Sequence, residues 1–234
     1  LIAGQDVNAR AADVTAGKQL AVGAGRDINV LAGDASGYTY NEIYYKTKGF
    51  LSSKTTHRIR ETEWTKGVSS TFGGDTVAML AGRDMTVLGS NIVGDRDVEI
   101  AVGRDLQILA KDETYKDYQY EKVKKSGFGG GGGFSIGYST QQRTDWMRGA
   151  SGGYSASTVG SAGGNLGIDA VRNVDVMASN LLAQDGNISV AGSNVAILAG
   201  VGDARQHEYH ELKQSGLTIG VAGGMLGAAQ QVQG

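Results

Sequence analysis

The chain of 234 residues contains no cysteine and no proline. Without cysteine it can form neither a disulfide nor a zinc–thiolate centre, and it has no cysteine nucleophile. It has no apolar run of 18 residues, the length that would indicate a membrane-spanning helix. The net charge is −2, without the basic excess typical of nucleic-acid-binding proteins. The charge balance therefore disfavours a nucleic-acid partner. We also expect no small-molecule substrate and no cofactor.

Glycine, in contrast, is abundant, with 38 residues, and five of these glycines belong to a short motif that recurs at intervals of 21 residues. The fullest form of the motif is Ala-Gly-Arg-Asp followed by an apolar residue. Its glycine and its acidic or amide residue are Gly4 and Asp6, Gly25 and Asp27, Gly82 and Asp84, Gly103 and Asp105, and, in a weaker copy, Gly192 and Asn194. A repeat near 20 residues followed by alternating apolar residues predicts a solenoid of short strands.

Each motif has the chemistry of a corner followed by a strand. Glycine tolerates a positive φ, and Asp or Asn can hydrogen-bond the backbone just after it. Shorter echoes at 97–100, 173–176 and 187–190 predict further strands, two or three in each coil. We expect about five or six coils. The predicted inward ladder is Val7, Ile28, Met85, Leu106 and Val195, with Val30, Val87, Ile108 and Ile197 beside them.

The coil pattern stops at the same point in three coils, after Leu31-Ala32, Leu109-Ala110 and Leu198-Ala199. The segments that follow are rich in Tyr, Thr, Lys and Glu, which suits exposed strands. They are too long for structureless loops. We predict β-hairpin-like insertions at about 37–72, 113–162 and 203–234, and a single domain, 1–234, that is a fragment of a longer repeat protein.

The first two insertions share two motifs. The first motif, Lys-x-x-Gly-Phe, contains Gly49-Phe50 and Gly127-Phe128. The second, Thr-(Glu/Asp)-Trp-x-(Lys/Arg)-Gly, contains Trp64 and Trp146, the two tryptophans of the chain. These matches predict that both insertions have one topology, leave from the same face and place the two tryptophans at equivalent positions.

Coils of this kind, broken by Tyr- and Lys-rich insertions, resemble the filamentous-haemagglutinin type repeats of two-partner secretion exoproteins. That class includes filamentous adhesins, haemolysins and contact-dependent growth-inhibition toxins. The resemblance covers essentially the whole chain. It implies a right-handed parallel β-helix, export through an outer-membrane secretion partner, and a location outside the cell or on its surface. It implies no catalytic residues in this region.

Three polar motifs have a possible site chemistry and a plainer alternative. His207-x-x-His210 could bind a metal on a helix, but on a strand the two side chains would face opposite sides. The motif aspartates could bind calcium, but Arg precedes most of them, which favours Arg–Asp pairing between coils. His57 stands alone and is expected at the surface.

Two glycine-rich segments invite other readings. The run Gly129–Gly133 lacks the Gly-Lys-Ser/Thr of a phosphate loop and is expected at a hairpin tip. Residues Ser215–Ala229 carry Gly216, Gly220 and Gly224 at intervals of four, which a helix-dimer face or a membrane-inserting segment would also show. We favour a strand packed on its own coil or hairpin.

The sequence thus predicts a stalk that takes part in adhesion or in toxin delivery, with the insertions meeting a target-cell receptor or outer membrane. A pore-forming haemolysin of the same secretion class is the alternative, and a β-helical enzyme such as a polysaccharide lyase is a third reading. The insertions could instead only shield the coils from edge-to-edge association.

Overall fold

The computed structural model describes residues 1–129, 135–222, 225–226 and 230–233. All regular structure among these residues is β-strand, so none of it is a helix that could cross a lipid bilayer. The chain divides into two compact units. The first, the coil stack, consists of residues 1–36, 64–114 and 152–203. The second, the insertion sheet, consists of residues 37–63, 115–151 and 204–234.

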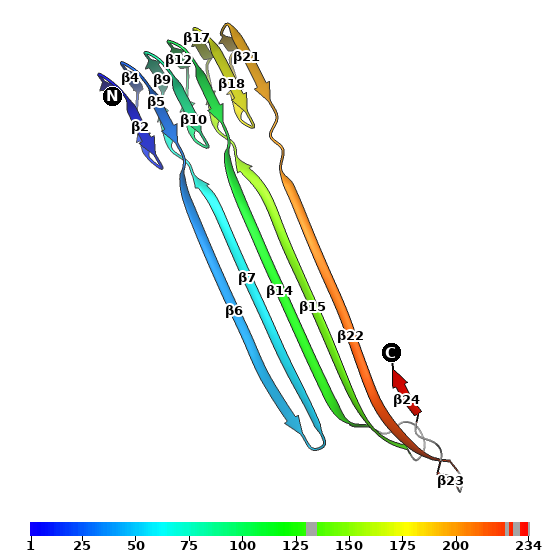
Figure 1. The fold of residues 1–234 in the computed structure, drawn as a ribbon. Helices are drawn as coiled ribbons and strands as arrows, with labels where there is room; N and C mark the ends of the chain where they lie inside the picture. The colour runs from blue at the N-terminus through cyan, green and yellow to red at the C-terminus, as the bar shows by residue number, and fades with distance from the viewer. Residues whose placement is uncertain (130–134, 223–224, 227–229, 234) are drawn as a thin grey trace. The chain divides into compact units, whose positions relative to one another are not determined.

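The coil stack is built from three parallel sheets (Figure 1). The first sheet contains β1 (Ile2–Ala3), β4 (Gln19–Ala24), β9 (Thr76–Ala81), β12 (Val98–Val102), β17 (Leu166–Ala170) and β20 (Ile188–Ala191). The second contains β2 (Val7–Arg10), β5 (Ile28–Leu31), β10 (Met85–Leu88), β13 (Leu106–Leu109), β18 (Asn173–Met177) and β21 (Asn194–Leu198). The third contains β3 (Asp13–Thr15), β8 (Thr71–Gly74), β11 (Asn91–Gly94), β16 (Thr158–Ser161) and β19 (Asn180–Ala183).

Each successive coil contributes one strand to each sheet, which confirms the predicted all-β parallel β-helix. Uninterrupted coils keep strict register, so that Met85 pairs with Leu106 and Val174 with Val195, 21 residues apart. Because every inward position lies over its equivalent in the next coil, the apolar side chains form continuous ladders. The described residues form six coils, each with two or three strands.

The ladder residues predicted to point inward form the core in the middle coils. Ile28, Met85 and Leu106 are fully buried. Burying a side chain of this size stabilises the fold by roughly 1.5–3 kcal/mol. Val195 and Ile197 keep the predicted register but are 45% and 64% exposed, because among the described residues no third strand and no further coil covers them.

One segment belongs to a different part of the coil than its sequence indicated. Residues 173–176 were expected as an additional strand, but β18 pairs in register with β13. The segment is therefore the fifth coil's copy of the main motif. Val171 stands where the motif has glycine, and Asn173 where it has Asp. These two replacements hid the copy from sequence inspection.

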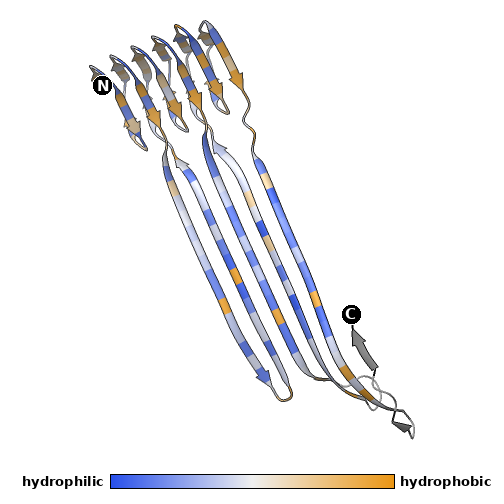
Figure 2. Ribbon diagram, in the orientation of Figure 1, coloured by the Kyte–Doolittle hydropathy of each residue, from blue (hydrophilic) through white to orange (hydrophobic). Residues whose placement is uncertain are grey.

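The insertion sheet is formed by the outer parts of long strands (Figures 1 and 2). The long strands are β6 (Gly33–Gly49), β7 (Ser52–Val68), β14 (Lys111–Gly129), β15 (Ser135–Ser155) and β22 (Asp203–Ala222). Across the sheet the long strands lie in sequence order, β6, β7, β14, β15 and β22. The short strands β23 (Met225–Leu226) and β24 (Gln230–Gln233) both pair with β22. β6 and β14 begin a few residues before the predicted insertion ranges, and β22 begins at the predicted residue, 203.

The insertions leave every second coil at the same place. In the second, fourth and sixth coils the chain departs after the strand of the second sheet, at β5, β13 and β21. In the second and fourth coils it returns to the strand of the third sheet, at β8 and β16. The first two insertions are both two-stranded hairpins, as predicted.

Candidate functional site

Glycine is required at the first corner of the coils, between the strands of the first and second sheets, because the backbones of successive coils approach closely there. A Cβ atom built on Gly25 would overlap the carbonyl oxygen of Gly4, and Gly82 and Gly103 meet the preceding coil in the same way. The Gly4 position itself is open. The glycine of the motif therefore serves coil stacking, and it does not adopt a positive φ there.

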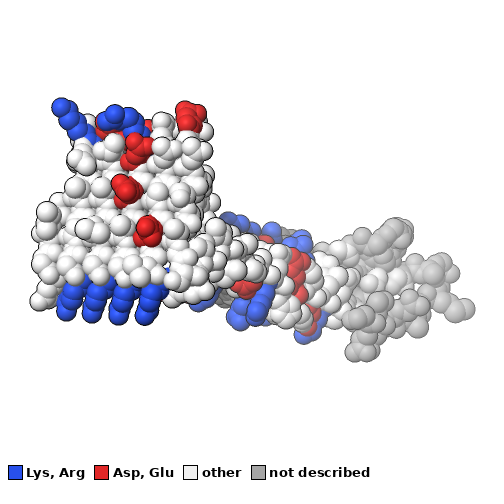
Figure 3. Space-filling model, turned by 90° about the horizontal axis from the view of Figure 1, so that it is seen from above, with Lys and Arg blue, Asp and Glu red and all other residues white. Residues whose placement is uncertain are grey.

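The Arg and Asp of the motif form a ladder of ion pairs along this corner. Arg83 donates from Nε and Nη2 to the two carboxylate oxygens of Asp27 in the preceding coil, at 3.0 and 2.6 Å. Arg26 binds Asp6 in the same way, and Figure 3 shows a regular row of basic side chains along one side of the coil stack. The other rungs are Arg104–Asp84 and Arg172–Asp105.

These pairs set the charge state of the corner. The guanidinium of Arg26 holds the pKa of Asp6 below its ordinary value, and Arg83 and Arg172 lower the pKa of Asp27 and Asp105. The backbone N–H of the next motif residue also donates to several of these carboxylates. The carboxylates are thus occupied by Arg and backbone donors. This arrangement supports pairing between coils rather than calcium binding.

A buried serine ladder forms the second corner, where the insertions leave. The backbone N–H of Ser70 donates to Ser90 Oγ at 3.2 Å, and the N–H of Ser90 donates to Ser157 Oγ at 3.1 Å. Each hydroxyl in turn donates to a backbone carbonyl of its own or a neighbouring coil. In the coils without an insertion, a residue with positive φ turns the chain at this point. These residues are Ala11, Gly89 and Ala178.

The insertion motifs do not occupy equivalent positions. Gly49 ends β6, and Phe50 is 95% exposed in the turn between β6 and β7. Phe128 lies within β14, where its N–H donates to the carbonyl of Leu51 and its ring lies 5.1 Å from that of Tyr138. The second hairpin therefore extends further than the first beyond the shared motif.

The prediction that the tryptophans are equivalent is wrong. Thr71 and Thr158 both pair with Asn91, yet Trp64 lies seven residues before the first and Trp146 twelve before the second. Trp64 belongs to the coil stack, where Lys66 lies over its ring. Trp146 belongs to the insertion sheet. These two distances differ by five residues, an odd number, so the two tryptophans also point to opposite sides of their strands.

One side of the insertion sheet, the aromatic face, carries a row of rings that crosses the strands. His57 lies edge-on to Tyr44 and to Tyr120, and its Nε2 is 2.7 Å from Glu42 Oε1. Trp146 stacks on Tyr209 with ring centroids 5.7 Å apart. His57, expected to be isolated, is thus a partner in a cross-strand network.

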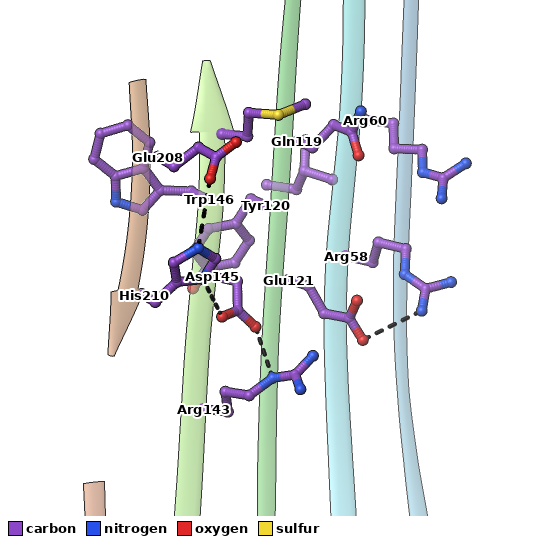
Figure 4. A pocket seen from close by; sticks show the side chains of 12 residues that line it. Arg58, Arg60, Gln119, Tyr120, Glu121, Arg143, Asp145, Trp146, Glu208 and His210 are labelled. Carbon is purple, nitrogen blue, oxygen red and sulfur yellow. Dashed lines mark hydrogen bonds and ion pairs between the residues drawn. The ribbon is translucent and has the colours of Figure 1, made fainter. Parts of the chain in front are cut away.

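The opposite side, the charged face, contains a trough of about 440 Å³ (Figure 4). Arg58 Nη2 donates to Glu121 Oε1 at 3.2 Å across β7 and β14. Asp145 on β15 is contacted by His210 Nδ1 at 2.9 Å. Its other oxygen lies 2.7 Å from Arg143 Nε, as an ion pair without hydrogen-bond geometry. Basic and acidic side chains alternate across the trough, so it can bind both cationic and anionic groups.

The two histidines of the His-x-x-His motif lie on opposite sides of β22. His207 packs edge-on against Trp146, whereas His210 pairs with Asp145, which raises the pKa of its imidazole. No cluster that could hold a metal ion exists among the described residues. The strand alternative to a metal site is therefore the one that the structure supports.

The two glycine-rich segments are only partly described. Of Gly129–Gly133, only Gly129 at the end of β14 lies within the described residues. Ser215–Ala222 is strand, not helix, and Ser215–Thr218 pair antiparallel with Gln230–Gln233. The helix-dimer reading is thus wrong for this part. Gly224 lies outside the described residues.

Sequence reasoning missed the groups that line the trough. Arg58, Glu121, Asp145 and His210 come from four strands, and each looks like an ordinary exposed residue in its own strand. Alternation along each strand could have sorted them by face. No repeated motif in the sequence fixes the alignment of these strands, so the sequence could not show that these residues lie together.

The stacked coils, their corner ladders and their regularly placed hairpins define a β-helical repeat protein. A model of the hemagglutinin repeat family matches residues 1–127, more than half of the chain. The chain also matches 16S rRNA endonuclease CdiA of Enterobacter cloacae subsp. cloacae, with 40% identity over 95% of this chain. It matches tRNA nuclease CdiA of Escherichia coli (37% over 91%) and Deoxyribonuclease CdiA of Dickeya dadantii (36% over 99%). The chain belongs to the hemagglutinin repeat family.

The chain spans 7% of the length of each of these three relatives. The names of these three relatives describe three different nuclease activities, whereas the matched segment is common to all of them. No solved structure matches the chain.

Proposed function

We propose that this chain is a stalk segment of a secreted bacterial cell-surface exoprotein that serves adhesion or contact-dependent delivery of a toxin to a target cell. Export would use an outer-membrane secretion partner, as the family resemblance implies. The observation that carries the proposal is that the two units differ in structure. The coil stack is a self-repeating core, and the insertions add exposed surface that the core does not need.

The coil stack supports the structural part of the proposal. Its ladders of buried side chains, Arg–Asp pairs and serines depend only on the neighbouring coils, which is the energetic design of a rod of variable length. The segment is shared by relatives named for different nucleases, so we assign it none of those activities.

The insertion hairpins support the part that concerns the target cell. At their ends they expose large apolar side chains, including Phe50, Leu51 and Ile136. Lysines flank these positions in the sequence, at Lys46, Lys48, Lys54, Lys124 and Lys125. Exposed apolar groups bordered by cations are typical of surfaces that meet another protein or a lipid surface.

The structure shows how to remove an insertion without disturbing its coil. Leu31 and Thr71 occupy the positions of Leu88 and Asn91, between which the uninterrupted third coil has only Gly89-Ser90. Replacing residues 32–69 by one glycine therefore recreates this turn as Leu31-Gly-Ser70. Replacing residues 110–156 by one glycine gives Leu109-Gly-Ser157 in the fourth coil.

We expect the full-length exoprotein with both replacements to be secreted and folded, but to engage target cells poorly. Circular dichroism checks the fold, and a cell-binding or toxin-delivery assay checks the function. As a control, the variant in which only residues 32–69 are replaced keeps the second hairpin and should retain part of the engagement. Normal delivery combined with increased aggregation of the hairpin-free variant would leave the insertions only a shielding role.

The alternative, a pore-forming haemolysin of the same secretion class, draws on the same exposed apolar side chains at the hairpin ends. Haemolysis by the full-length protein that disappears when Phe50 and Ile136 are changed to Ser would favour it. Haemolysis that is absent from the unmodified protein would favour the stalk.

A further inference from the structure

A second pocket on the charged face has a different character from the trough. Its volume is about 420 Å³, and it is lined by Lys54 of β7, Lys125 of β14, Arg143 of β15 and three uncharged side chains. Glu121 is the one carboxylate on its wall. The pocket lies entirely within the insertion sheet.

The positive charge in this pocket is not neutralised from within. Glu121 is already paired with Arg58, and Asp145 with His210 and Arg143 (Figure 4). Lys54 and Lys125 form none of the ion pairs found among the described residues. Because Arg143 uses Nε toward Asp145, both of its Nη groups remain for another acceptor. The pocket therefore presents two ammonium groups and part of a guanidinium to solvent.

The rest of the lining adds specificity to this charge. The amide of Gln141 can both donate and accept a hydrogen bond, and Val123 and Leu212 give the pocket an apolar wall. Five of the seven lining residues are polar or charged, so the pocket suits a polar, anionic ligand with a small apolar side. Arg and Lys together suit phosphate oxygens, which accept from a guanidinium and from point charges.

We propose that this pocket binds a phosphorylated sugar. Lys54, Lys125 and Arg143 hold the phosphate, Gln141 binds a hydroxyl, and Val123 with Leu212 packs against the apolar side of the ring. The proposal is independent of the proposed function, because it concerns a ligand that the purified protein binds by itself, with or without a target cell.

Isothermal titration calorimetry of the full-length exoprotein with glucose 6-phosphate, glucose and inorganic phosphate tests the site. We expect glucose 6-phosphate to bind, inorganic phosphate to bind more weakly, and glucose not to bind. Lys54→Gln and Lys125→Gln should each weaken glucose 6-phosphate binding by about tenfold, since each removes a hydrogen bond to a charged group. Lys48→Gln, a lysine on β6 outside the pocket, is the matched control and should change nothing.

Unchanged affinity in the Lys54→Gln, Lys125→Gln double variant, with an unchanged thermal melt, would overturn the site. Equal binding of inorganic phosphate and glucose 6-phosphate would overturn the role of Gln141 and the apolar wall. A lipid source of the phosphate is distinguished by vesicles of phosphatidylglycerol in phosphatidylcholine. Lysine-dependent binding to these vesicles, with no binding of glucose 6-phosphate, would overturn the assignment to a sugar.

Discussion

Arg83 binds Asp27 across 56 residues of sequence, with Nη2 2.6 Å from Oδ2, while the whole first hairpin lies between them in the chain. The pair joins consecutive coils as if the hairpin were absent. The same link joins Arg26 to Asp6, where no insertion intervenes. The corner ladder is therefore insensitive to what is inserted elsewhere in the coil.

This ladder makes the coil stack sensitive to acid. Asp6, Asp27 and Asp105 each have a pKa lowered by an Arg partner. A lowered folded-state pKa gives stability that is complete above the unfolded value, near 3.8, and is lost as pH falls through the folded value. Thermal melts between pH 7 and pH 2.5 should show a falling melting temperature below about pH 4. In the Asp27→Asn, Asp105→Asn variant this fall should be smaller; an equal fall would assign the acid sensitivity to other groups.

Gly82→Ala should destabilise the coil stack by about 1–3 kcal/mol, the range for overpacking a well-packed site. The new methyl group would overlap the Gly25 carbonyl, which is backbone and cannot rotate away. Gly4→Ala is the matched control, because nothing lies within 4 Å of a Cβ atom there. Chemical denaturation measures both. Equal stabilities of the two variants would contradict the close approach of the coils.

Ser90→Ala should cost about 1–3 kcal/mol, because it leaves the buried N–H of Ser70 without an acceptor. Ser193→Ala removes a hydroxyl that donates to the carbonyl of Val171 at an exposed position, and should cost little. Urea melts of the two variants compare them directly. The serine ladder would be dispensable if Ser90→Ala were as stable as Ser193→Ala.

Leu106→Asp should unfold the coil stack, since it places an unpaired charge at a fully buried position. Gln107→Asp, one residue later and pointing outward on the same strand, should leave the fold intact. Circular dichroism distinguishes the outcomes. A folded Leu106→Asp protein would show that the inward ladder can be broken without loss of the coil.

Ala178→Gly should stabilise the protein by about 1 kcal/mol, because Ala178 has a φ of 50° that costs a non-glycine residue about this much. Gly89 occupies the same turn of the third coil. Ala183→Gly, within β19, should instead destabilise. A destabilised Ala178→Gly variant would show that the methyl group contributes more by packing than the backbone loses by strain.

The sequence predicted the coils well because two independent signals agree there. The 21-residue spacing fixes which residues are neighbours, and period-two alternation fixes which side they face. Where either signal faded, the prediction failed. Val171 and Asn173 concealed the fifth copy of the motif, although Val174 still follows the apolar pattern.

The insertions were predicted as hairpins but not in register. Their strands are polar on both faces, so no burial pattern selects one alignment over another. Matching Trp64 with Trp146 failed because the second hairpin has additional residues between its tryptophan and the coil. The trough and the second pocket on the charged face depend on that register, and no spacing along the chain could show them.

The placement of hairpins in alternate coils also constrains how such a gene can lengthen. Two coils rise by about 9.6 Å, and the two strands of a hairpin occupy about the same width in a sheet. Successive hairpins can therefore lie side by side without a gap or a crowded strand. Duplicating a single coil would break that match. The smallest duplication that preserves it is a pair of coils together with one hairpin, so this family should gain and lose such segments as whole double-coil units.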